Sequence, residues 1–166
     1  ERILLINPSC KVNEVVDFFT SKNSDEVLSC HYDYVIDSID SVRNKCLLIS
    51  ECTKRNIPII TTGGAGGKFD VTQIQIADLN KSYNDKLLLV IRNNLKRFHG
   101  FPRDKKKPYN IPCVFSPEDR TMPEQSCNTS NLNCTTGFGA ITHITGVFGF
   151  MAAGHVVNSI VESSRE

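Results

Sequence analysis

The sequence contains no tryptophan and no C-x-x-C pair, although it has seven cysteines. Without such a pair, a structural zinc ribbon is not expected. The opening residues, ERILLINPSC, lack the basic start and long apolar core of a secretory leader. An odd number of cysteines without a compact spacing pattern indicates reduced thiols, so we expect an intracellular protein of the cytoplasm or the mitochondria.

The sequence also has no large excess of charge of either sign, because it contains 19 Lys and Arg and 18 Asp and Glu. The chain as a whole therefore lacks the basic character typical of a nucleic-acid-binding domain. The charge is nevertheless uneven, since residues 95–108, LKRFHGFPRDKKKP, are rich in Lys and Arg and include aromatic residues. Such a run is usually a solvated loop, and the alternative is a contact with RNA phosphates.

The length of 166 residues suits one domain with a buried core. Apolar strand patterns at 34–36 and 57–62 flank a segment with helical spacing of apolar residues at 41–56. A strand, a helix and a strand at this spacing predict a βαβ unit, and therefore an α/β fold with parallel strands. Residues 2–8 are predicted to form another strand, and 13–20 and 25–29 short helical pieces.

The stretch TTGGAGGKFD is rich in glycine and ends near a lysine, as phosphate-binding loops do. A Walker loop requires Gly where Thr62 stands, and Ser or Thr where Phe69 follows Lys68. The residues after Asp70 favour a strand and not the helix that a dinucleotide loop would open. The local pattern therefore favours a strand-to-strand connection, with a ligand loop as the alternative.

Two acids, Asp37 and Asp40, follow the first strand of the predicted βαβ unit. They can cap the next helix, or they can hold a magnesium ion against nucleotide phosphates. Lys45 could neutralise such phosphates or lie on the helix surface. Because ligands of open α/β sheets gather at the carboxyl ends of strands, these residues and the glycine loop are expected at one edge of the sheet.

The second half of the chain contains an amphipathic helix at 84–98 and a long, mobile loop at 100–133 that surrounds a short strand at 111–116. Residues 137–157 contain no Asp, Glu, Lys or Arg, and an uncharged stretch of this length could span a membrane. Their histidines, threonines and glycines favour a buried or subunit-interface helix instead.

Several segments in succession resemble one family: INPSCKV, YDYVIDSIDSVRNKCLLISEC, IPIITTGGAGGKFDVTQIQIADL, CVFS and NCTTGFGA. They are similar to the tRNA threonylcarbamoyladenosine dehydratases of the ubiquitin-activating-enzyme-like (ThiF/MoeB-type) adenylating superfamily. The resemblance extends from about residue 2 to residue 157. It implies a Rossmann-like adenylating fold, a mixed sheet with flanking helices, of which residues 1–166 form a single C-terminal portion.

The resemblance implies an ATP-dependent dehydration that cyclises threonylcarbamoyladenosine, next to the anticodon of a tRNA, through an acyl-adenylate. ATP, magnesium and in some cases a monovalent cation would be bound, and a homodimer is expected. An alternative is an activator of a ubiquitin-like or sulfur-carrier protein, with Cys134 as thioester nucleophile. Another is a non-catalytic remnant of the fold that binds a partner or a membrane.

The resemblance assigns Asp40 to magnesium and ATP and places Cys134 near the substrate, so Asp40 and Cys134 are the candidate catalytic residues. The nucleotide is expected to contact Asp37, Asp40, Lys45, Gly63 and Gly64. From the charge pattern of the basic run, Lys105, Lys106 and Lys107 are the candidate contacts with the tRNA. The family's G-x-G-G-V-G loop is not found in this sequence, so we expect residues 1–166 alone to bind ATP weakly and to be inactive.

Overall fold

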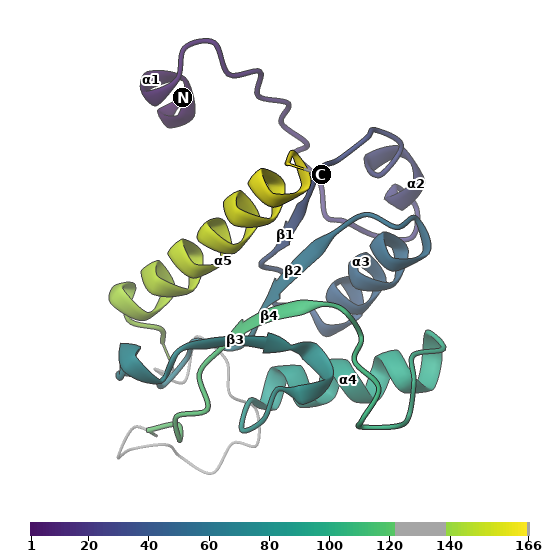
Figure 1. Cartoon of the computed structure of the whole chain (residues 1–166), viewed down its shortest axis with the longest axis vertical. Helices are drawn as coiled ribbons and strands as arrows, with labels where there is room; N and C mark the ends of the chain where they lie inside the picture. Colours follow the sequence, from purple (N-terminus) through teal and green to yellow (C-terminus); the bar gives the residue numbers. More distant parts are fainter. Residues whose placement is uncertain (122–138, 166) are drawn as a thin grey trace.

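The computed structural model describes residues 1–121 and 139–165 (Figure 1). One four-stranded sheet contains β1 (Val35–Asp37), β2 (Ile59–Thr62), β4 (Pro112–Phe115) and β3 (Gln75–Asp78), in that spatial order. β1, β2 and β4 are parallel, whereas β3 runs antiparallel to β4. The predicted α/β class, βαβ unit and mixed sheet with flanking helices are thus confirmed.

The long helices lie on opposite faces of the sheet (Figure 1). On one face, α3 (Val42–Lys54) and α4 (Lys86–Phe98) pack against alternate strand residues such as Ile59 and Phe115. On the other face, α5 (Thr142–Ser163) packs against Ile60 and Val114. Neighbouring residues of one strand therefore enter different clusters, because successive side chains of a strand point to opposite faces.

The start of α4 follows from its sequence. The Asp85 side chain accepts a hydrogen bond from the Leu88 backbone N–H at 2.9 Å and caps the helix. Leu88, Ile91 and Leu95, spaced three and four residues apart, are fully buried. The helix predicted over residues 84–98 is confirmed with this face toward the sheet.

The prediction of a strand over residues 2–8 is wrong, because α1 (Arg2–Ile6) is a short helix. Leu5 and Ile6 are exposed, and the backbone N–H of Asn7 bonds to the carbonyl of Ile3 at 2.8 Å. No described strand lies beside this segment, so its backbone bonds close locally. Residues 13–20 form no helix, whereas α2 (Ser24–Val27) matches the second predicted helical piece.

Two short 3₁₀ helices complete the described elements: η1 (Val71–Gln73) and η2 (Leu79–Lys81). The glycine stretch therefore connects β2, through η1, to β3, which confirms the predicted strand-to-strand connection. Within the predicted loop at 100–133, the expected strand is present as β4. Residues 122–133 of that loop lie outside the described residues.

α5 is long and apolar enough to cross a membrane by length and composition, although a single such helix is weak evidence. Ile144, Phe148 and Ala152 form its buried stripe against the sheet. The opposite side remains apolar and exposed, with Phe150 at 80% exposure. The predicted helix is therefore present, and it is buried along one stripe only.

The core thiols lead to a prediction about reactivity. Cys46, Cys52 and Cys113 are buried, and burial raises the pKa of Cys46 and Cys52 to about 11 and that of Cys113 further. N-ethylmaleimide at pH 8 should label Cys10 and Cys30 in the folded protein, but the three core thiols only in denaturant. Peptide mass spectrometry measures this, and fast labelling of Cys113 in the folded protein would contradict the packing.

Candidate active site

A cavity of about 580 Å³ lies at the carboxyl ends of β1 and β2. Its lining includes the exposed Asp40 from the β1–α3 turn, the backbone at Gly63 and Gly64, and Arg120 beyond β4. Residues from the first half of α5, among them Phe148, close another side. The structure thus brings Asp40 and the glycine loop to one cavity, as expected because both follow the carboxyl ends of neighbouring parallel strands.

The β1–α3 turn is built on a buried ion pair. Lys45 Nζ lies 2.9 Å from Asp37 Oδ2, and neither side chain is exposed. Asp37 also accepts hydrogen bonds from the Thr61 hydroxyl at 2.7 Å and from the Ile39 backbone N–H at 2.9 Å. Lys45 in turn donates to the Ile39 carbonyl at 3.0 Å. The pair therefore fixes the shape of the turn that follows β1.

The turn separates two acids that look alike in the sequence. Asp37 is bonded within the protein, whereas Asp40 is exposed and lines the cavity. Asp37 and Lys45 support the position of Asp40, and a direct contact of either with a nucleotide stays a prediction.

The glycine loop is bonded inward. The Gly63 N–H donates to the Val114 carbonyl at 2.8 Å, and the Gly64 N–H donates to Asp85 Oδ2 at 2.9 Å. A Cβ on Gly63 would lie 2.5 Å from the same carboxylate oxygen. The backbone N–H groups of a Walker loop donate to phosphate oxygens. Here the N–H of Gly64 donates to the carboxylate of Asp85 instead.

Lys68 does not line the cavity at Asp40. Its side chain is fully buried, donates to the Ser116 carbonyl, and places Nζ 3.7 Å from Asp85 Oδ2. Burial lowers the pKa of Lys68, and the negative charge of Asp85 partly opposes that shift. Lys68 therefore connects the loop to the segment after β4.

Three residues of this region were not predicted: Asp85, Glu118 and Arg120. The Glu118 carboxylate accepts hydrogen bonds from the backbone N–H groups of Phe69 and Asp70 at 2.9–3.0 Å. An acid directly before an amphipathic helix is a capping signal that could have drawn attention to Asp85. Glu118 and Arg120 follow β4 in an irregular segment without a local signal.

Other predicted residues lie elsewhere. Lys105, Lys106 and Lys107 are exposed on the segment after α4 and do not line the cavity. Cys134 lies outside the described residues. Within the described ranges, no three His, Cys, Asp or Glu side chains are grouped so that they could hold a metal ion.

The model of the ThiF family matches residues 1–166, so the chain belongs to the ThiF family. Among curated proteins, it is 44% identical over 165 residues to the tRNA threonylcarbamoyladenosine dehydratase of Haemophilus influenzae, covering 98% of this chain and 63% of that protein. It is 41% identical over 171 residues to the Escherichia coli protein of the same name, covering 97% and 64%.

Two solved structures of the Escherichia coli dehydratase, TcdA, are similar over 99% of this chain and 63% of theirs. The complex with AMP has a TM-score of 0.88 at 41% identity. The complex with ATP has a TM-score of 0.86 at 42% identity. These comparisons confirm the resemblance and the Rossmann-like adenylating fold, and the chain spans about 63% of the length of these relatives.

The buried pair leads to a prediction about stability. Lys45→Met leaves the Asp37 carboxylate buried without its counter-charge, so we expect a loss of about 3–5 kcal/mol in the free energy of unfolding. Lys54→Met, which removes an exposed lysine from the same helix, should change it little. Urea unfolding monitored by circular dichroism measures both. Equal effects would contradict a structural role for the pair.

The packing of the glycine loop leads to a second prediction about stability. Gly63→Ala places a methyl group against Asp85 and Phe115, so we expect destabilisation of about 1–3 kcal/mol. Gly146→Ala on α5 meets nothing within 4 Å and should stabilise the protein by about 0.5–1 kcal/mol. Thermal unfolding of both variants provides the comparison, and a neutral Gly63→Ala would show that the loop is not tightly packed.

Proposed function

We propose that this protein acts as an ATP-dependent tRNA threonylcarbamoyladenosine dehydratase that works through an acyl-adenylate. The observation that supports this most is the cavity holding Asp40 and the glycine loop, in a chain 41–42% identical to solved dehydratase structures that contain AMP and ATP. The proposed activity is that of a full-length protein of this family, since the chain spans about 63% of the length of these relatives.

The chemistry explains why a nucleotide is needed. The carboxylate of the threonyl group is a poor electrophile, and transfer of AMP to it creates a good leaving group as pyrophosphate departs. The carbamoyl part of the same side chain then attacks the activated carbonyl, closes a ring and releases AMP. The net change in the nucleoside is the loss of one water molecule.

Asp40 is the residue of this chain best placed to serve the triphosphate. Its carboxylate is exposed at the cavity, and magnesium in nucleotide sites is held by one or two carboxylates together with phosphate oxygens. A magnesium ion bound there would neutralise negative charge on the phosphates. Arg120, which lines the same cavity, would contribute a fixed positive charge toward an anionic substrate.

The partners proposed for the whole protein are a tRNA, which the exposed Lys105, Lys106 and Lys107 would contact, and a second copy of the chain. The curated relatives are named for a tRNA nucleoside, which supports the first. The exposed apolar side of α5 supports the second, because apolar patches of this kind are typical of interfaces. We propose an intracellular location for this tRNA-modifying activity.

Asp40→Asn in the full-length protein tests the proposal. Loss of this charge beside the phosphates should lower ATP–pyrophosphate exchange, measured with threonylcarbamoyladenosine-containing tRNA, by roughly 100-fold or more. The thermal midpoint should hardly change, because the side chain is exposed. Asp33→Asn, which removes an exposed acid outside the cavity, is the matched control. Ordinary exchange by Asp40→Asn would reject this role.

A further inference from the structure

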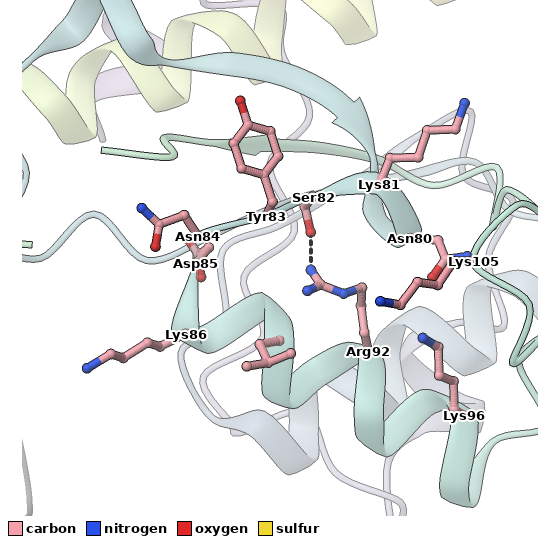
Figure 2. Close-up of a pocket in the computed structure, with 11 residues that line it drawn as sticks. Asn80, Lys81, Ser82, Tyr83, Asn84, Asp85, Lys86, Arg92, Lys96 and Lys105 are labelled. Carbon is pink, nitrogen blue, oxygen red and sulfur yellow. Dashed lines mark hydrogen bonds between the residues drawn. The ribbon is translucent and has the colours of Figure 1, made fainter. Parts of the chain in front are cut away.

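A second cleft, of about 420 Å³, lies between η2, the turn into α4, the outer side of α4 and the segment after it (Figure 2). We name it the basic cleft, because its lining includes five cationic side chains: Lys81, Lys86, Arg92, Lys96 and Lys105. It shares only Asp85 with the immediate surroundings of the glycine loop, to which Asp85 is hydrogen-bonded. It is therefore distinct from the cavity at Asp40.

Arg92 forms the fixed part of the cleft. It is half-buried on α4 and donates a hydrogen bond to the Ser82 hydroxyl, as the dashed line in Figure 2 shows. The Ser82 hydroxyl donates in turn to the Leu79 carbonyl at 2.9 Å. Burial lowers the pKa of Arg92, which means that the cation has lost part of its hydration. A held, partly dehydrated guanidinium is well suited to bind an anion.

Two lysines face the same space. Lys96 lies one helical turn beyond Arg92, and Lys105 reaches the cleft from the following segment (Figure 2). Burial lowers the pKa of Lys96, and repulsion by Arg92 and Lys105 lowers it further, so the three cations are close enough to interact. None of the three pairs with a carboxylate among the residues that the structure describes.

The acids around the cleft are already occupied. Asp78 accepts hydrogen bonds from the backbone N–H groups of Asn80 at 2.8 Å and Tyr109 at 3.1 Å. Asp85 caps α4, and Asp104 accepts from the Lys106 N–H at 2.9 Å. These carboxylates are bonded to the surrounding backbone. Asp85 is the one carboxylate among the residues that line the cleft, and the five cations there outnumber it, so the cleft keeps an excess of positive charge that an anion can neutralise.

Asn80 holds the segment that carries Lys105. Its amide nitrogen donates to the carbonyl oxygens of Asp104 at 3.1 Å and Lys107 at 2.8 Å, which fixes this segment against η2. The side-chain oxygen of Asn80 is itself buried and does not face the open space of the cleft. Asn80 therefore positions the cation of Lys105 at the cleft and is not a ligand contact.

We propose that the basic cleft binds the sugar–phosphate backbone of an RNA strand, with Arg92, Lys96 and Lys105 around a phosphate. Contacts of Lys and Arg with backbone phosphates hold RNA independently of its sequence. The inference rests on the proposed function, in which that RNA is the substrate tRNA. It adds a phosphate site on α4 to the exposed lysines at 105–107.

The test uses the full-length protein with a fluorescently labelled anticodon stem-loop RNA. The double variant Lys96→Gln and Lys105→Gln should bind it several-fold more weakly at low salt. Its slope of log affinity against log salt should fall by roughly 0.7–0.9 per lost phosphate contact. The matched control, Lys11→Gln with Lys22→Gln, removes two exposed lysines outside the cleft and should bind as the unmodified protein does.

Two further arms identify the source of the phosphate. Calorimetry with inorganic phosphate shows whether the cleft prefers a free anion: phosphate binding lost in the double variant, with unchanged RNA affinity, would overturn the proposal. Titration with a DNA stem-loop of the same sequence tests the assignment to RNA. Weaker binding of DNA is expected, because its phosphates are arranged differently from those of an A-form RNA stem. Equal or tighter binding of DNA would overturn the assignment to RNA.

ATP–pyrophosphate exchange, measured in parallel on the unmodified protein, separates this proposal from the proposed function. If exchange occurs with substrate tRNA while the double variant keeps full RNA affinity, the cleft assignment fails and the function stands. If the cleft binds RNA as expected but no exchange occurs, the dehydratase assignment fails and the RNA site stands.

Discussion

The buried carboxylate of Asp85 is the interaction on which this part of the molecule depends. One oxygen caps α4, and the other accepts from the loop at Gly64 and lies near Lys68. A single side chain thus sets the position of a helix, a glycine loop and a buried lysine. Asp85 lines the basic cleft and is hydrogen-bonded to Gly64, which lines the cavity at Asp40, so it lies between the two openings.

The buried pair of Asp37 with Lys45 likewise fixes the backbone of the turn that follows β1. In both places a buried carboxylate lies beside a buried lysine inside the protein. Asp40 and Arg120 line one opening, whereas the cations of α4 line the other.

Local patterns were sufficient to predict the βαβ unit, α4 and the strand-to-strand character of the glycine loop, because each depends on periodicity or on the residues next to it. They were not sufficient for Lys45, which was predicted to bind phosphate or to lie on the helix surface. In the structure Lys45 is buried and pairs with Asp37. Arg92 bonds to Ser82 before the start of α4 and Asn80 bonds to the segment after α4, and no local pattern predicts that these contacts form one cleft. The N-terminal strand prediction was wrong because no described neighbour pairs with it.

β2 and β4 are hydrogen-bonded neighbours, yet β3, α4 and residues 99–111 all lie between them in the sequence. Pairing across so long a connection is a non-local contact, and such contacts are typical of slowly folding proteins. Asn80 ties residues 104–107, which precede β4, to η2. A ligand bound in the basic cleft would stabilise the folded state, and it would thereby slow the exchange of those amide hydrogens of β4 that open only when the protein unfolds.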